Sequence, residues 1–151
     1  MVRKAVIDSR INDISTQNWL GDVNERCSCL NYRLFKKNLR FENYLTNLSF
    51  RERISFTKFR CANGKLPANR SHELIFESTT CFLCDSGDVG DAYHYLLVCE
   101  AFNSRRRELI KPYYRNHPNI LKFEKLMSLE SGKNLKNLIK MIDFILHCFN
   151  V

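Results

Sequence analysis

The stretch Cys81–Cys99, CFLCDSGDVGDAYHYLLVC, contains four side chains of the kinds that bind zinc. Cys81 and Cys84 form a C-x2-C pair, and His94 and Cys99 follow with the spacing H-x4-C. Thiolate sulphur and imidazole nitrogen are the ligands of closed, tetrahedral zinc sites. Such a pair with a second pair close by is a strong signal, so the stretch predicts a small zinc-binding CCHC module of loop and helix. The alternative is three buried free cysteines and an ordinary core histidine.

Two glycines, Gly87 and Gly90, lie in the spacer between the two ligand pairs. A chain that turns back on itself often needs a residue with positive φ, which glycine adopts without strain. His94 lies in a short predicted helix, and Cys99 is five residues further on, about 140° around a helix of 3.6 residues per turn. Both side chains can reach one ion only if the helix ends near Val98 and the chain bends there.

The predicted zinc is structural, with no catalytic residue assigned. Four protein ligands fill a tetrahedral site and leave no position for water or substrate. A zinc deaminase needs H-x-E and P-C-x-x-C, but Leu96 stands in place of the Glu and Thr80 in place of the Pro. The H-E-x-x-H, P-loop and G-x-S-x-G motifs are also absent. We therefore do not expect this chain to be an enzyme.

Helical patterns surround the cysteine-rich stretch and predict a mainly α fold with no convincing sheet. The sequence S-x-x-E at Ser49 and Glu52 is a capping box that begins one helix, and Asp91 and Asn119 are candidate N-caps for two others. Apolar stripes are predicted on the first helix (Val6, Ile11, Ile14, Trp19), the third (Phe50, Ile54, Thr57, Cys61) and the last (Leu135, Leu138, Ile139, Ile142, Ile145). The predicted helices cover about 2–20, 32–47, 49–62, 91–98, 102–111, 120–129 and 133–149, with one short extended piece at 74–76.

At 151 residues the chain suits one compact unit. Within it we distinguish a helical segment (1–64), the zinc module with a basic helix (65–115) and a C-terminal helical tail (116–151). The start of the chain is not a signal peptide, and the seven cysteines then indicate an intracellular, reducing compartment, nuclear or cytoplasmic. No segment is apolar enough to predict a membrane partner.

The charge of the chain indicates an acidic partner. Twenty-four Lys and Arg oppose sixteen Asp and Glu, a net charge of +8, which favours RNA or DNA. Tyr113 and Tyr114 add aromatic rings that stack on bases. The alternative for each basic cluster is a solvated helix face. The predicted nucleic-acid-binding residues are Arg51, Arg53, Arg60, Arg70, Arg105, Arg106, Arg107 and Lys111.

Several motifs from about Trp19 to Leu126 resemble the C-terminal end of non-LTR (LINE-type, jockey-like) retrotransposon polyproteins. The resemblance rests on Asn31–Lys36 (NYRLFK), Phe41–Leu45 (FENYL), Phe56–Cys61 (FTKFRC), Leu66-Pro67, and the four zinc ligands followed by Arg106. Where related sequences usually carry a Gly-Arg turn after Leu-Pro, this chain has Asn69-Arg70, and Gly64 stands where a His is common.

The resemblance implies a nucleic-acid-binding module that works beside a reverse transcriptase core and is detached here from its polymerase domain. It does not imply catalysis, because no Asp-Asp pair of the polymerase signature occurs in the chain. Two other functions stay open: a zinc-stabilised protein-interaction module that docks through Tyr113, Tyr114 and the last helix, and a non-functional retroelement fragment. The oligomeric state is not predicted.

Overall fold

The computed structural model describes residues 2–25, 31–62, 66–69 and 79–149. It is mainly α, as predicted; within these ranges the only β pairing is an isolated antiparallel bridge between Thr80 and Val89. The extended piece expected at 74–76 lies outside the described residues. The helices are α1 (Val2–Glu25), α2 (Tyr32–Phe35), α3 (Tyr44–Asn47), α4 (Phe50–Arg60), η2 (Pro67–Asn69), η3 (His94–Val98), η4 (Glu100–Phe102), α5 (Asn103–Leu109), α6 (Pro112–Arg115), α7 (Ile120–Met127) and α8 (Gly132–Cys148).

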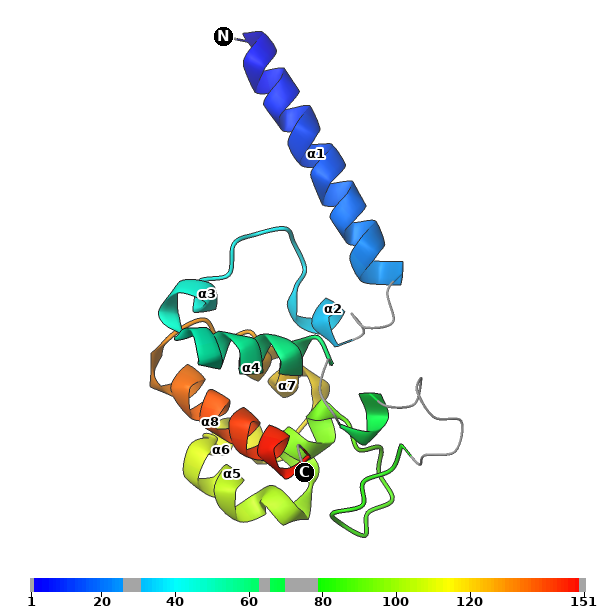
Figure 1. Ribbon diagram of the computed structural model, residues 1–151, viewed down its shortest axis with the longest axis vertical. Helices are drawn as coiled ribbons and strands as arrows, with labels where there is room; N and C mark the ends of the chain where they lie inside the picture. Colours follow the sequence, from blue (N-terminus) through cyan, green and yellow to red (C-terminus); the bar gives the residue numbers. More distant parts are fainter. Residues whose placement is uncertain (1, 26–30, 63–65, 70–78, 150–151) are drawn as a thin grey trace.

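Helix α8 is the centre of the core. Its predicted apolar face is buried: Leu135, Leu138, Ile139, Ile142 and Ile145 are each at most 1% exposed. Helices α4 and α5 pack against α8, and α2 packs against α7 (Figure 1). Elements on both sides of the Cys81–Cys99 stretch therefore share one hydrophobic core.

Two predicted caps are present. The Ser49 amide donates to Glu52 Oε2 at 2.8 Å and the Glu52 amide donates to Ser49 Oγ, which closes the capping box of α4. Hydrogen bonds from Ser49, with Lys136 beside them, lower the pKa of Glu52 to about 2. Because this pKa is depressed, the stabilisation is present above the ordinary glutamate range and is lost as the pH falls towards 2. Asn119 caps α7 by accepting from the Lys122 amide at 2.9 Å.

The prediction of one helix over 32–47 is wrong. The chain forms two single-turn helices, α2 and α3, separated by non-helical residues 36–43. Glu42, in this connection, pairs with Arg60 of α4 at 2.6 Å and with Lys36 at 3.6 Å. These contacts hold the connection outside helical geometry although its apolar residues have a helical period.

The stripe predicted on α4 is not the face that packs into the core. Phe50 is 71% exposed and Ile54 is 38% exposed, whereas Phe56 and Phe59 are buried. The Phe56 ring packs edge-on against Tyr44 of α3, with ring centroids 4.9 Å apart. The position of α3 and α8 around α4 therefore selects a different face from the one the apolar period indicates.

Helix α1 is longer and less covered than predicted. It continues through Gly21 to Glu25 and extends away from the other helices (Figure 1). Its predicted apolar stripe is exposed, with Ile11 55% and Ile14 46% accessible. Burial begins only at Val23, near α2. In the described part of the chain, no helix combines the length and hydropathy needed to cross a bilayer.

Candidate metal centre

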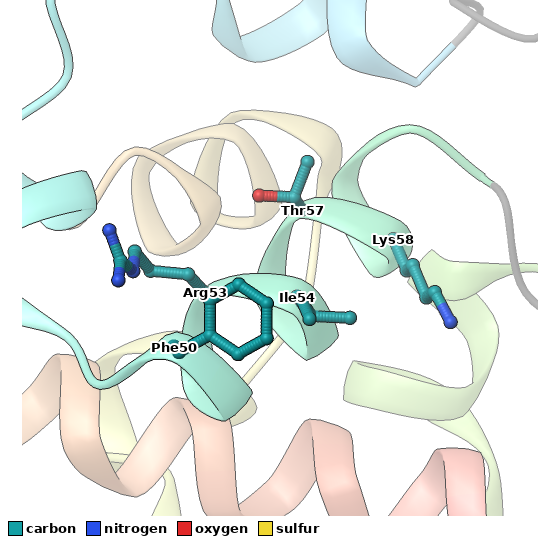
Figure 2. Close-up of a pocket in the computed structure, with 5 residues that line it drawn as sticks. All are labelled: Phe50, Arg53, Ile54, Thr57 and Lys58. Atoms are coloured by element: carbon teal, nitrogen blue, oxygen red, sulfur yellow. The ribbon is translucent and has the colours of Figure 1, made fainter.

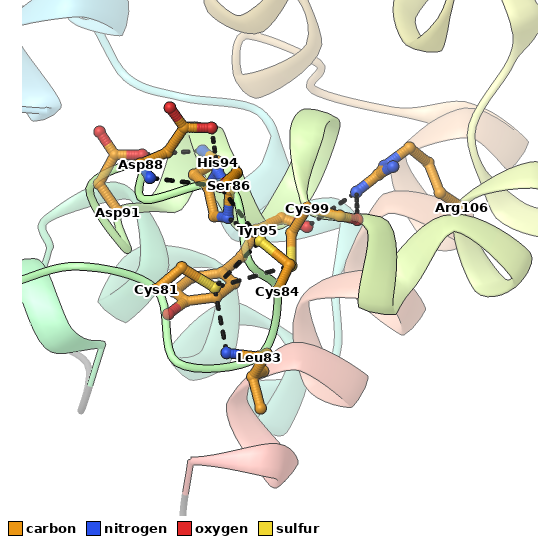
Figure 3. A network of polar contacts seen from close by, with 10 residues as sticks. All are labelled: Cys81, Leu83, Cys84, Ser86, Asp88, Asp91, His94, Tyr95, Cys99 and Arg106. Carbon is orange, nitrogen blue, oxygen red and sulfur yellow. Dashed lines mark hydrogen bonds and ion pairs between the residues drawn. The ribbon is translucent and has the colours of Figure 1, made fainter.

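The four predicted ligands converge on one point (Figure 3). The three cysteine sulphurs and a ring nitrogen of His94 all lie within 4.8 Å of one another. Cys81 Sγ is 3.6 Å from Cys84 Sγ and 3.8 Å from Cys99 Sγ, and Cys84 Sγ is 3.4 Å from His94 Nε2. This Cys3His cluster could hold a metal ion.

The loop that carries Cys81 and Cys84 is closed by backbone hydrogen bonds. The Cys81 amide donates to the Asp88 carbonyl and the Gly90 amide to the Thr79 carbonyl, each at 2.8 Å. Gly87 has φ +72°, as the turn prediction requires. Gly90 has a different constraint, because a Cβ there would lie 2.5 Å from the hydroxyl oxygen of Tyr95.

The second ligand pair is brought together by a π-helical turn. Asp91 caps the start of this turn, as predicted, by accepting from the His94 amide at 2.8 Å. Residues His94–Val98 are π-helical, and the Cys99 amide donates to the His94 carbonyl at 2.7 Å. The chain then leaves the helix with extended geometry at Cys99 (ψ 124°). The wider π-helical turn and this bend place the side chains of His94 and Cys99, five residues apart, at one site.

Asp88 lies behind the histidine, and sequence analysis missed it. Its Oδ2 is 3.5 Å from His94 Nδ1, while His94 Nε2 faces Cys84. A carboxylate on the second ring nitrogen orients a metal-binding histidine and fixes its tautomer. The acidic residues of the C-x9-H spacer were the available signal, but spacing alone does not distinguish Asp88 from Asp85.

Tyr95, also missed, lies under the cluster. It is fully buried, and its hydroxyl has no hydrogen-bond partner among the described residues although it lies beside Cys81 (Figure 3). Burial, followed by the neighbouring Cys81, raises the pKa of Tyr95. An orphaned buried hydroxyl is costly. A deprotonated Cys81 would supply the acceptor, so the site suits a thiolate ligand of a cation.

The cysteines differ in acidity. Hydrogen bonds from Ser86 lower the pKa of Cys84 to about 6, and burial raises the pKa of Cys99 to about 12. Cys84 is half-buried and lines a hollow of about 520 Å³ together with Ser86 and Glu100. Cys84 is therefore more acidic than Cys99, and it lies at the hollow.

Arg106, predicted to bind nucleic acid, is buried instead. It is 4% exposed, and its guanidinium donates to the carbonyls of Leu96 (2.8 Å) and Cys99 (2.7 Å), with a longer contact to that of Tyr95 (Figure 3). Burial lowers its pKa. Arg106 thus gives hydrogen bonds to carbonyls in the π-helical turn and just after it. It ties α5 to the metal ligands and is not available to a phosphate.

Arg60 is a second correction. It is 2% exposed and pairs with Glu42 at 2.6 Å. Four aromatic rings lie 5.2–5.5 Å from its guanidinium carbon, those of Tyr32, Phe35, Tyr44 and Phe56. A charge enclosed by rings and paired with a carboxylate holds the α2–α4 region together and does not face a ligand.

The other predicted basic residues lie nearer the surface. Arg53 is half-buried, and it donates to the Leu45 carbonyl at 3.0 Å beside the exposed ring of Phe50 (Figure 2). Arg105 pairs with Glu108 at 2.8 Å. Arg51, Arg107 and Lys111 are exposed. Arg70 lies outside the described residues.

No protein-family model matches the chain, and neither the curated proteins nor the solved structures contain a significant match. The resemblance to retrotransposon polyproteins therefore stays a prediction.

Proposed function

We propose that the chain is a zinc-stabilised module that binds RNA or DNA, of the kind found at the C-terminal end of retrotransposon reverse transcriptases. The observation that carries the zinc part of the proposal is the convergence of Cys81, Cys84, His94 and Cys99. Zinc is the ion that such a set of one imidazole and three thiolates suits best. Its role is structural, since four protein ligands complete a tetrahedron.

The distances support zinc as the ion. Zn–S bonds of about 2.3 Å place two sulphurs of a tetrahedron about 3.8 Å apart. The sulphurs of Cys81 and Cys99 are 3.8 Å apart and those of Cys81 and Cys84 3.6 Å apart. The Cys3His set thus needs little rearrangement to accept the ion.

The metal would shape a basic helix. Arg106 links the Cys99 carbonyl to α5, and its neighbours Arg105 and Arg107 are exposed on the same helix. An ion that fixes Cys99 therefore also fixes the position of these two charges. Arg105, Arg107, Arg51 and Lys111 are the four exposed residues of the predicted nucleic-acid-binding set that the structure describes. The chain as a whole has a net charge of +8.

Metal content tests the first part of the proposal. Protein purified without chelators is expected to contain one zinc per chain by elemental analysis, and Cys84→Ser to contain much less. Cys148→Ser, which changes an exposed cysteine outside the cluster, is the control. Substoichiometric metal that Cys84→Ser leaves unchanged would overturn the zinc site. A chain that does not fold with saturating zinc would instead indicate a non-functional fragment.

Salt dependence tests the second part. Contacts from Arg51, Arg105, Arg107 and Lys111 to four phosphates predict a log–log slope of affinity against salt of about −3. The double change Arg105→Ala with Arg107→Ala is expected to reduce the slope to about −1.5 while the thermal transition stays in place. Lys140→Ala, an exposed lysine on α8, is the matched control. No binding, or a flat salt response, would exclude nucleic acid as the partner.

A protein-interaction function has one observation in its favour. Phe50, Ile54 and Thr57 line an open apolar hollow of about 360 Å³ on α4, with Arg53 and Lys58 at its sides (Figure 2). Of the docking surface predicted from Tyr113, Tyr114 and the last helix, Tyr113 is 54% exposed, but Tyr114 is 6% exposed and the apolar face of α8 forms the core. Phe50→Asp separates the two functions, because it should abolish capture of a protein partner and leave nucleic-acid affinity unchanged.

A further inference from the structure

Tyr113, on α6, presents an accessible ring between two lysines of α7. The residue is 54% exposed. Lys122 Nζ is 5.5 Å and Lys125 Nζ 5.0 Å from the centroid of its ring. The lysines are three positions apart on one helix, so they approach the ring from the α7 side and leave more than half of the residue open.

The ring is held in place by its surroundings. The next residue, Tyr114, is buried and meets Tyr113 edge-on with ring centroids 5.0 Å apart. Lys122 also donates to the carbonyls of Asn116 (2.5 Å) and His117 (3.1 Å), which fixes its ammonium beside the end of α6. Tyr113 and Lys122 are therefore a pre-organised pair, and Lys125 is an exposed charge beside the same ring.

The surrounding charge is positive. Residues 103–125 contain seven Lys or Arg and two Glu, which gives five of the eight net positive charges of the chain. Both glutamates have partners: Glu108 is paired with Arg105 at 2.8 Å, and Glu124 lies 3.9 Å from Lys37. Among the described residues no carboxylate pairs with Lys122 or Lys125. An anionic ligand at Tyr113 would meet uncompensated cations.

We propose that Tyr113 stacks on an unpaired base while Lys122 and Lys125 bind the adjoining phosphates of single-stranded nucleic acid. This inference rests on the proposed function and adds the strandedness of the ligand and the site at which it binds. Aromatic side chains next to a positive groove are the usual means of binding single strands without sequence preference. A duplex offers phosphates but no free base face, so it can use the lysines and not the ring.

The test measures fluorescence anisotropy of wild-type protein with twelve-nucleotide oligo(U), with oligo(dT) and with a twelve-base-pair RNA duplex. Loss of one stacked base weakens binding by about fivefold at the low end of the expected range. Tyr113→Ala is therefore expected to weaken single-strand affinity by about fivefold or more, leave duplex affinity unchanged and keep the salt slope. Tyr113→Phe retains the affinity because it keeps the ring.

The lysines have a different expected effect. Lys125→Ala removes one phosphate contact and is expected to make the single-strand salt slope shallower by about 0.7. Lys140→Ala on α8 should leave the slope unchanged. If Tyr113→Ala weakens the affinity for oligo(U) only, or for both oligo(U) and oligo(dT), the result supports the inference. It also shows which of the two single strands binds at the ring.

The two proposals fail in different ways. If the wild-type protein binds none of the three probes, the nucleic-acid function fails and the inference fails with it. If the wild-type protein binds but Tyr113→Ala has no effect, or weakens single strand and duplex equally, the stacking site is wrong and the proposed function stands. The thermal transition of each variant, which an exposed side chain should not move, confirms that the comparison is between folded proteins.

Discussion

Helix α1 and the segment from Cys81 to Phe102 differ in both regular secondary structure and burial: α1 is regular and mostly exposed, and the segment is irregular and more buried. Helix α1 has 24 residues of regular helix and leaves Ile7, Ile11 and Ile14 about half exposed. The Cys81–Phe102 segment contains only short helices, η3 and η4, yet Tyr95, Leu96 and Cys99 in it are fully buried. Regular secondary structure and burial are thus separate properties in this chain.

The difference has a physical cause. A helix makes its backbone hydrogen bonds between residues four apart, so α1 needs no distant partner to satisfy its backbone. The Cys81–Phe102 segment has little regular helix and depends on the meeting of its own four ligands at one site and on contacts with Arg106 and α8. Stability should therefore be concentrated in the segment with the least regular structure.

The sharpest test is removal of a ligand. Cys99→Ser leaves an incomplete tetrahedron, and zinc binding of this kind supplies on the order of 10 kcal/mol of folding free energy. The variant is expected to lose the cooperative thermal transition, measured by near-UV circular dichroism. Cys148→Ser should keep it. A Cys99→Ser protein that melts like the wild type would mean that the core is stable without the ion.

The second test removes the link between the ligands and α5. Arg106→Ala removes the guanidinium donors to the carbonyls of Leu96 and Cys99 and should lower the unfolding free energy by about 3 kcal/mol. Arg107→Ala, the exposed neighbour, should produce no measurable change. Urea denaturation of the two variants measures the difference. Equal stability would show that the Arg106 contacts are replaced by water.

The third test concerns affinity and not folding. Asp88→Ala removes the carboxylate behind His94 and is expected to weaken zinc binding by about 10- to 100-fold. Competition with a chromophoric chelator measures the change. Asp85→Ala, which alters another exposed carboxylate of the same loop, is the control. Equal effects of both changes would assign the loss to loop charge rather than to orientation of the histidine.

The smallest effect is expected in α1. Ile11→Ala shortens an exposed side chain and should change the unfolding free energy by less than about 0.5 kcal/mol. Val23→Ala, in the same helix but 7% exposed, should cost about 1.5 kcal/mol. A large loss of stability in Ile11→Ala, measured by thermal melts, would mean that the apolar stripe of α1 is covered. It would then contradict the difference between α1 and the Cys81–Phe102 segment.

Several features followed from the sequence because their causes are local. The ligand set, the capping box at Ser49 and the caps at Asp91 and Asn119 each depend on a few residues at fixed spacing. The buried face of α8 also followed, since a helix with one strongly apolar side has only one way to meet a core. The mainly α class is the sum of such local signals.

Other features were predicted wrongly because a pattern does not identify its partner. The 32–47 stripe predicted one helix, but the pairing of Glu42 with Arg60 divides it. The stripe on α4 predicted the core face, but Phe56 and Phe59 occupy the core. Nothing in the sequence distinguishes Arg106, which is buried, from Arg105 and Arg107 on either side.

The sequence alone determined which residues could meet at a metal, because thiols and imidazole at this spacing have few other uses. Only the tertiary structure decided what the cluster holds together. It placed Asp88 behind His94, Tyr95 beneath Cys81 and Arg106 on the carbonyls of Leu96 and Cys99, and it brought Lys122 and Lys125 to Tyr113. Ligand chemistry is a property of side-chain type, whereas these contacts depend on how distant segments pack.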